Sequence, residues 1–298
     1  MVHDTDAGSP RRILLVVGAG AAGVFAAIQA AEADPQARLI VCEAGNEALR
    51  KVRISGGGRC NVTNAETDPR RLVTHYPRGG RELRGPLHRF GSAAMQAWLQ
   101  DRGVVLKTEA DGRVFPASDD SRSIVDCLLA AATAAGVELR YRCPVQRLRP
   151  TAAGIEVGLP GGSLMADRVL LATGSARQGW RLAAELGVDC IAPAPSLFTF
   201  NIPRPDLHAL AGIASPAADI ALQVGDERWR RRGPLLVTHW GLSGPAVLWC
   251  SAWAARAMQD NNYQATIVIR WLAGFDATAA RRWIEEQRQQ HGRRGSAT

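Results

Sequence analysis

The sequence predicts an α/β protein in which a nucleotide-binding β-α-β unit is followed by a second, partly β domain. One observation is an apolar run, residues 13–17, that leads into GAGAAG and an alanine-rich stretch. Another is an apolar run, residues 38–42, that ends at Glu43. A third is the change of composition near residue 192, where prolines become frequent. Alternating strand and helix signals, followed by a change in composition, indicate two domains.

The first domain is expected to span residues 13–192, after a polar segment, 1–12, that we expect to be disordered. Short apolar runs bounded by turn residues read as strands, and longer periodic stretches read as helices. The expected order is strand 13–17, helix 24–33, strand 38–42, an irregular stretch 45–81, helix 82–103, extended pieces 104–106 and 113–115, helix 121–135, several strands between 137 and 172, and helix 178–186.

The second domain is expected to span residues 193–298 and to be partly β. Prolines interrupt its extended segments, and seven of the eight tryptophans lie at or beyond Trp180. Residues 233–257 read as a loop that feeds a helix, and they are followed by a strand at 265–271 and a helix at 277–290.

The charge of the chain is a weak guide to its partners. The net charge is +8 and the pI about 9.7, yet only Lys51 and Lys107 among the 36 basic residues are lysines. The arginine clusters are short and spread along the chain, so a nucleic-acid partner is not expected. Six scattered cysteines without a CxxC pair favour neither a disulfide framework nor a structural zinc site. Without a signal peptide or a long apolar run, we expect a cytoplasmic protein that binds no membrane.

The pattern Gly18-x-Gly20-x-x-Gly23 stands between a predicted strand and a predicted helix. This context is typical of dinucleotide binding, because the turn is tight and the helix N-terminus favours a pyrophosphate. Gly20 would let the backbone approach the pyrophosphate, and Gly23 would let the helix pack on the strand. Glu43 ends the next strand, where it would accept hydrogen bonds from ribose hydroxyls.

The stretch VRISGGGRCNVTN, residues 52–64, follows on the ligand side of the predicted sheet. Three consecutive glycines allow the backbone to approach a flat ring or a phosphate closely. Neighbouring cations and amides supply charge and hydrogen bonds. The run VLLATG, 169–174, is expected to be a buried strand that ends in Thr173 and Gly174 and turns near the same ligand.

Several motifs in this order resemble the HI0933-like flavoprotein family: GAGAAG, SGGGRCNVTN, DGRVFPAS at 111–118, LATG and THWGLSGP at 238–245. The resemblance implies a Rossmann-like fold of the two-dinucleotide-binding-domain type that binds FAD. Members include NAD(P)/FAD-dependent oxidoreductases, aminoacetone-oxidase-like enzymes and reductases of unsaturated steroid-like ketones. By this resemblance the FAD-binding residues are Gly18, Ala19, Gly20, Ala21, Ala22, Gly23, Glu43, Ala44, Lys51, Ser55, Gly56, Gly57, Gly58, Arg59, Cys60, Asn61, Val145, Thr173 and Gly174.

The sequence differs from the family pattern at its C-terminal end. Family members continue into a glycine-rich strand-to-helix segment that returns to the FAD domain, and nothing in residues 275–298 resembles it. We therefore expect the second domain to be incomplete, and a catalytically inactive relic or a nucleotide-binding protein stays open as an alternative function.

The expected activity is hydride transfer between a small organic substrate and FAD. Either O₂ or NAD(P)H would be the other redox partner, and NAD(P)H would dock only transiently because the chain has one GxGxxG pattern. His239 is the candidate proton donor or substrate contact, whereas Cys60 reads as a structural thiol. An RNA-modifying flavoprotein is a further alternative. No metal site and no oligomeric state are predicted.

Overall fold

The computed structural model describes residues 11–291, which divide into two compact units between Ile191 and Ala192. The segment expected to be disordered lies outside the described residues except for Arg11 and Arg12. The first unit contains β1 (Ile13–Val17), α1 (Ala21–Ala33), β2 (Arg38–Cys42), α2 (Arg50–Ile54), η1 (Ser55–Gly58), β3 (Thr63–Asn64), α3 (Pro69–Leu72), η2 (Val73–His75), α4 (Gly80–Arg89), α5 (Ser92–Gln100), β4 (Leu106–Thr108), β5 (Arg113–Pro116), α6 (Arg122–Ala134), β6 (Glu138–Arg140), β7 (Arg147–Thr151), β8 (Gly154–Leu159), β9 (Gly162–Ala166), β10 (Arg168–Leu171) and α7 (Arg177–Glu185).

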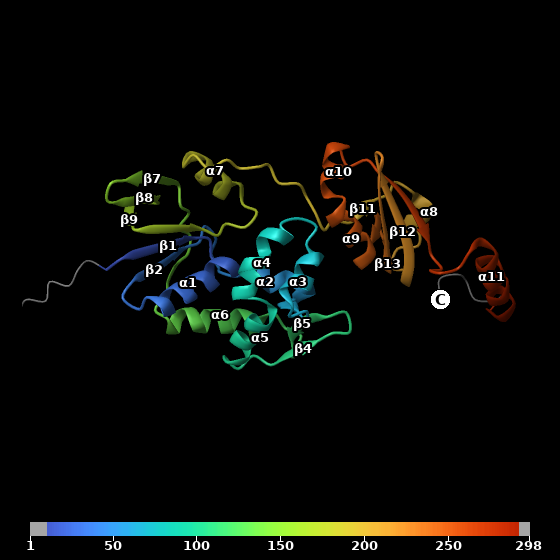
Figure 1. The fold of residues 1–298 in the computed structure, drawn as a ribbon, viewed down its shortest axis with the longest axis horizontal. Coiled ribbons are helices and arrows are strands. Elements are labelled where there is room, and N and C mark those ends of the chain that lie inside the picture. The colour runs from blue at the N-terminus through green and yellow to red at the C-terminus, as the bar shows by residue number, and fades with distance from the viewer. Residues whose placement is uncertain (1–10, 292–298) are drawn as a thin grey trace, which may run out of the picture. The chain divides into compact units, whose positions relative to one another are not determined.

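A four-stranded parallel sheet in the order β10-β1-β2-β6 forms the centre of the first unit (Figure 1). The β1 and β2 strands are joined by α1, as the β-α-β pattern predicts. Strand β10 lies at the sheet edge and is only partly buried, so the expectation of a buried strand at VLLATG is wrong for this segment. Leu170 in β10 is 46% exposed.

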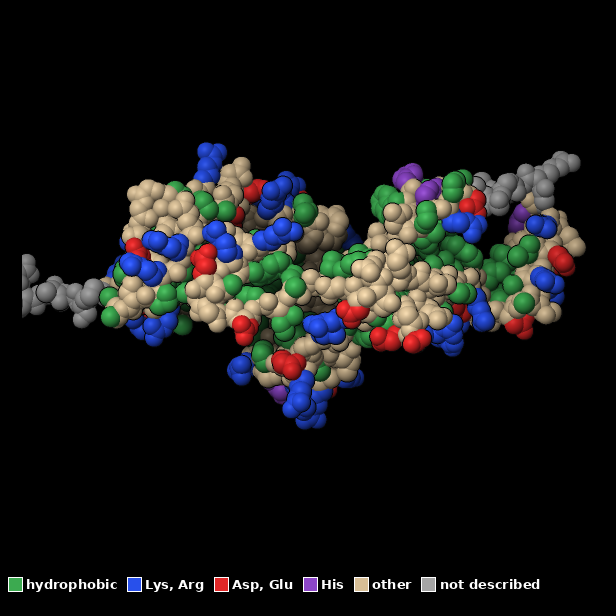
Figure 2. Space-filling view, turned by 90° about the horizontal axis from the view of Figure 1, so that it is seen from above, with side chains coloured by type: hydrophobic (Ala, Val, Ile, Leu, Met, Phe, Trp, Pro, Cys, Tyr) green, Lys and Arg blue, Asp and Glu red, His purple; other side chains and the backbone are tan. Residues whose placement is uncertain are grey.

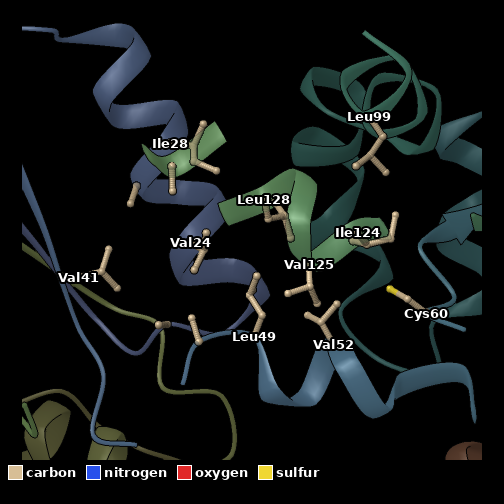
Figure 3. Close-up of a cluster of buried hydrophobic side chains, with 14 of the residues drawn as sticks. Val24, Ile28, Val41, Leu49, Val52, Cys60, Leu99, Ile124, Val125 and Leu128 are labelled. Carbon is tan, nitrogen blue, oxygen red and sulfur yellow. The ribbon is translucent and has the colours of Figure 1, made fainter. Parts of the chain in front are cut away.

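Both faces of this sheet are covered, because side chains alternate along each strand. Val16 and Val41 point into an apolar cluster with α1 and α6, part of which is shown in Figure 3. Leu15 and Ile40 point the other way, into a cluster shared with the antiparallel sheet β7-β8-β9. The turn at 160–161 joins β8 to β9. This two-sided burial explains why β1 and β2 are continuously apolar.

Two expectations about helices and loops in the first unit are wrong. The helix expected at 82–103 is two helices, α4 and α5, with a break at Phe90 and Gly91. A Cβ at Gly91 would stand 2.6 Å from the Leu87 carbonyl oxygen, so the chain turns there in close contact with the preceding helix. The stretch 45–81, expected to be irregular, contains short helices from α2 to η2.

The second unit is built on a five-stranded antiparallel sheet in the order β11-β14-β13-β12-β15 (Figure 1). Its apolar face packs against α9 and α10 around buried residues such as Leu222 and Val247. The segment expected to be a loop before the helix is in fact the second half of β13 and all of β14, because Leu235 and Val237 alternate into the core. Its elements are β11 (Phe200–Asn201), α8 (Pro205–His208), β12 (Ala214–Val224), β13 (Glu227–Thr238), β14 (Gly241–Ser243), α9 (Pro245–Trp253), α10 (Ala255–Asp260), β15 (Thr266–Arg270) and α11 (Ala277–His291).

Among residues 11–291, no helix is long and apolar enough to cross a membrane. Within the same range, no cluster of three or more His, Cys, Asp or Glu side chains has the arrangement of a metal site.

Candidate functional site

A cavity of about 680 Å³ opens in the first unit where β1, β2 and β10 end. Its volume lies in the range typical of small-molecule and cofactor sites. The carboxyl ends of parallel strands are where nucleotides bind in open α/β sheets. The predicted residues that line it are Gly18, Ala19, Gly20, Ala21, Ala22, Glu43, Lys51, Ser55, Cys60, Asn61, Thr173 and Gly174.

The glycines of the first motif serve different purposes. A Cβ added to Gly20 would meet no atom within 4 Å, so this backbone is open to a ligand. A Cβ on Gly23 would stand 1.9 Å from the Gly18 carbonyl oxygen, so Gly23 permits the helix to pack on the turn and does not line the cavity. Helix α1 begins at Ala21 without a side-chain cap. Its first N–H groups therefore provide a site for an anion.

Glu43 lies half-buried at the edge of the cavity. Its Oε2 accepts a hydrogen bond from the Ala19 N–H at 2.8 Å, and its Oε1 accepts one from the Gly45 N–H at 2.7 Å. The carboxylate thus ties together the two loops that follow β1 and β2. Each oxygen keeps a free lone pair, so ribose hydroxyls can still donate to Glu43 as predicted.

The glycine run bends the chain sharply beside the cavity. Gly56, Gly57 and Gly58 all have positive φ, at +56°, +69° and +85°. A Cβ on Gly56 would also stand 2.8 Å from the Asn61 nitrogen. Ser121 holds the bend, because its N–H donates to the Gly58 carbonyl at 2.8 Å and its Oγ donates to the Arg53 carbonyl at 2.7 Å. The three glycines themselves do not line the cavity, whereas the flanking Ser55, Cys60 and Asn61 do.

Two cations face the cavity from α2. Neither Arg50 nor Lys51 forms an ion pair within the described part of the chain. The Lys51 Nζ donates to the Ser175 Oγ at 2.9 Å, across to the loop that follows β10. Together with the N-terminus of α1, these cations favour an anionic ligand.

An apolar pocket that sequence reasoning missed continues the cavity between three helices. Phe25 comes from α1, Met95 and Leu99 from α5, and Ile124 and Leu128 from α6. Figure 3 shows Leu99, Ile124 and Leu128 within the same apolar cluster. The available signal was the apolar face of each helix, but periodicity alone does not separate a core position from a pocket wall.

Cys60 is a buried thiol within the cluster that holds Val52 and Ile124 (Figure 3). Burial raises the pKa of the Cys60 thiol, and a hydrogen bond with Ser55 opposes this only in part. The thiol therefore stays protonated at neutral pH, as a structural cysteine does.

The remaining predicted residues lie elsewhere. Arg59 pairs with Glu109 at 2.6 Å and stacks over the Phe115 ring at 4.1 Å, so its charge is already matched. Ala44 is exposed and does not line the cavity. Val145 is packed in the core on the opposite face of the sheet. His239 belongs to the second unit, exposed in the turn between β13 and β14.

The parallel sheet, the glycine turn and the cavity at the strand ends define a Rossmann-type dinucleotide-binding fold. Residues 12–244 match the model of the HI0933-like protein Rossmann domain. Residues 194–297 match the model of the HI0933-like protein barrel and H2TH domain. The chain therefore belongs to the HI0933-like family, as its motifs predict.

Curated relatives carry two different functional names. The chain is 29% identical over 250 residues to the ribosomal RNA dihydrouridine synthase of Escherichia coli K12, with 80% of this chain and 60% of the relative covered. It is 26% identical over 275 residues to the 3-dehydro-bile acid delta(4,6)-reductase of Clostridium scindens, with 90% and 66% covered. The chain thus spans about 60% of the length of the first of these relatives.

Solved structures align with the chain at low identity and with TM-scores below 0.5. The 3-ketosteroid-delta4-(5alpha)-dehydrogenase of Rhodococcus jostii RHA1 aligns with a TM-score of 0.46 and 17% identity, over 88% of this chain and 67% of that one. The THI4 protein of Thermovibrio ammonificans aligns with a TM-score of 0.41 and 14% identity, over 60% and 64%.

Proposed function

We propose that this chain is an FAD-dependent oxidoreductase that reduces a carbon–carbon double bond conjugated to a carbonyl group. The observation that carries the proposal is one cavity with three kinds of wall: a helix N-terminus beside cations, a carboxylate at the end of β2, and an apolar pocket. A pyrophosphate, a ribose and flat rings are the chemical parts that such walls fit. FAD contains all three.

The printed names of two relatives support the reaction class. A bile-acid delta(4,6)-reductase and a dihydrouridine synthase act on different molecules, yet each name describes saturation of a ring double bond near a carbonyl group. A small organic substrate with such a bond is therefore our first candidate. The second candidate activity is that of an oxidase that passes electrons to O₂. The remaining alternative is a relic that has lost catalytic activity.

FAD, when bound, supplies hydride transfer to or from a substrate carbon. The chain's own residues bind and orient it. The first N–H groups of α1, with Arg50 and Lys51, would hold the pyrophosphate, and Glu43 would accept from the ribose. The apolar residues between α1, α5 and α6 would exclude water from one end of the cavity. His239 stays our candidate proton donor, and NAD(P)H our candidate hydride source.

The first test is the visible absorption spectrum of the full chain after incubation with FAD and removal of the excess. A retained flavin spectrum is expected, and the Glu43→Gln variant should lose part of it while keeping the same circular dichroism. A folded but colourless wild-type chain would contradict the proposal.

The second test separates the two redox partners. The flavin-loaded chain is mixed anaerobically with NADPH or NADH and a 3-keto-4-ene steroid, and both nicotinamide absorbance and the saturated product are followed. Product formation without O₂ supports a reductase. Peroxide formation under air, with no saturated product, would instead favour the oxidase.

A further inference from the structure

The open face of the sheet in the second unit carries a row of arginines. Arg228, Arg230 and Arg232 alternate along β13, and Arg270 ends β15. The register places Asp219 of β12 between Arg232 and Arg270. All four arginines are exposed. They surround a hollow of about 500 Å³.

The other face of the same strands is the core of the unit. Ile220 and Leu222 of β12 are buried there, and Arg231 of β13 lies over the Trp249 ring at 5.0 Å. Because side chains alternate along a strand, the arginines on either side of Arg231 must point to the opposite, solvent-facing side.

Most of the charge on this face has no partner. Asp219 binds Arg232 through two hydrogen bonds of 2.7 and 3.0 Å. Within the described residues, Arg228, Arg230 and Arg270 form no ion pair, and the Arg228 Nη2 only donates to the Gln223 Oε1 at 3.4 Å. Like charges held side by side repel one another, so an anionic partner would stabilise this arrangement.

The shape of the face favours a chain of phosphates. Ala221 lies between Arg230 and Val268 in the register, and its small side chain forms the floor of the hollow. Alternate residues of a strand are roughly 7 Å apart, which is close to the separation of successive phosphates in an extended nucleotide strand. The guanidinium fork matches phosphate oxygens in pairs. A flat lipid surface would meet the rim without filling the hollow.

We propose that this arginine face, defined by Arg228, Arg230, Arg232 and Arg270, binds the sugar–phosphate backbone of RNA. This binding would be a property of the second unit and goes beyond the function proposed above. Basic side chains are scattered over the surface of both units (Figure 2), so the local density of charge matters more than the total. The sequence did not predict a nucleic-acid partner, because its arginines are spread along the chain. Only the strand pairing brings residues 228 and 270 to one face.

The test measures binding of the full chain to a short fluorescein-labelled single-stranded RNA by anisotropy at several salt concentrations. Wild-type affinity should fall with salt, by a slope of about 0.7 per phosphate contact in the logarithmic plot. The variant R228A/R230A/R270A should bind roughly tenfold more weakly at low salt and lose about two from the slope.

The matched control is R256A/R281A/R288A, which removes the same charge from exposed positions of α10 and α11. It should keep most of the wild-type affinity and slope. Equal losses in both triple variants, or no loss in the first, would overturn the proposal. So would complete displacement of the RNA by vesicles of an anionic phospholipid at equal phosphate concentration, since that marks a membrane-binding face.

Flavin absorbance and NAD(P)H-dependent steroid reduction are recorded for every variant. Salt-dependent RNA binding by a chain that holds no flavin would contradict the proposed function while leaving the arginine face intact. A flavin-loaded, active chain that binds no RNA would do the reverse.

Discussion

Gly20 and Gly23 belong to one motif but act through different contacts. Gly20 has an ordinary extended backbone, with φ of −77°, and faces open space. Gly23 lies against the Gly18 carbonyl, and no side chain fits between them. Gly20 therefore leaves space for a ligand, whereas Gly23 allows α1 to pack against the turn.

This difference predicts opposite outcomes for two alanine variants. G23A should lower the free energy of unfolding by about 1–3 kcal/mol, because an extra methyl group overpacks the contact. G20A should leave thermal unfolding of the apo chain nearly unchanged and weaken FAD binding, because its methyl group enters the ligand's space. Calorimetry and flavin titration measure the two effects. Loss of FAD binding without loss of stability in G23A would contradict this division.

Buried thiols make the chain sensitive to alkaline pH. Burial raises the pKa of Cys42 to about 12 and that of Cys250 to about 11. A thiol with a raised pKa in the folded state stabilises the fold below its ordinary pKa and loses that contribution as pH rises toward the folded value. We therefore expect the melting temperature to fall as pH rises from about 8 to 11.

The same burial predicts an order of alkylation. Cys190 is exposed, whereas Cys42, Cys60 and Cys250 are buried. Iodoacetamide at neutral pH should modify Cys190 first, with mass spectrometry identifying the site. Modification of Cys60 at the same rate would mean that its thiol is reactive, contrary to a structural role.

At the scale of elements, the N-terminus of α6 supports the glycine bend. Ser121 precedes α6, yet its hydroxyl does not cap that helix. It donates instead to Arg53 at the end of α2, and the Ser121 side chain is buried. A serine before a helix usually indicates an N-cap, and a long-range partner such as Arg53 leaves no local signal in the sequence.

Replacing Ser121 by alanine tests this support. The variant leaves the Arg53 carbonyl without its donor, and we expect a loss of about 1–3 kcal/mol in unfolding free energy. The weakened bend should also reduce FAD affinity. Ser123→Ala, at a half-buried position whose hydroxyl contacts only the nearby Ser118 hydroxyl, serves as control. Unchanged stability of S121A would show that the bend is held by other contacts.

Elements with a strong local pattern were predictable. Residues 13–17 and 38–42 are strands at the predicted bounds, because both faces of the sheet are buried and the runs are apolar throughout. The long hairpin of β12 and β13 was missed, because Arg230, Arg231 and Arg232 are consecutive and resemble a charge cluster, although the strand directs Arg231 to the Trp249 ring. The break between α4 and α5 depends on a contact of Gly91 that periodicity does not register.

At the scale of the whole molecule, two separate cores divide the chain. The buried clusters of the first unit contain no residue beyond Leu186, and the cluster of the second begins at Phe198. The predicted site residues are divided between the two units as well. Motif context placed most of the predicted glycine-turn and loop residues in the cavity of the first unit, whereas His239 falls in the other unit. Val145 has no spacing signal to distinguish a ligand contact from the core.

Separate cores predict two unfolding transitions. FAD should stabilise the first unit alone. At a ligand concentration one hundred times the dissociation constant, its free energy of unfolding should rise by about 2.7 kcal/mol, and its melting temperature should rise with it. Differential scanning calorimetry with and without FAD measures this. A single transition that shifts as one would show that the units unfold cooperatively.

The run Gly56–Gly58 has a stereochemical consequence. All three residues occupy the left-handed region, which is the mirror image of the region preferred by ordinary L-amino acids. At Gly57, with φ of +69° and ψ of +33°, an L-alanine would strain the backbone, whereas a D-alanine introduced by semisynthesis would have its preferred torsion angles. This bend is thus a short segment of the chain whose geometry suits the opposite chirality, and glycine is the genetically encoded residue that accommodates it most easily.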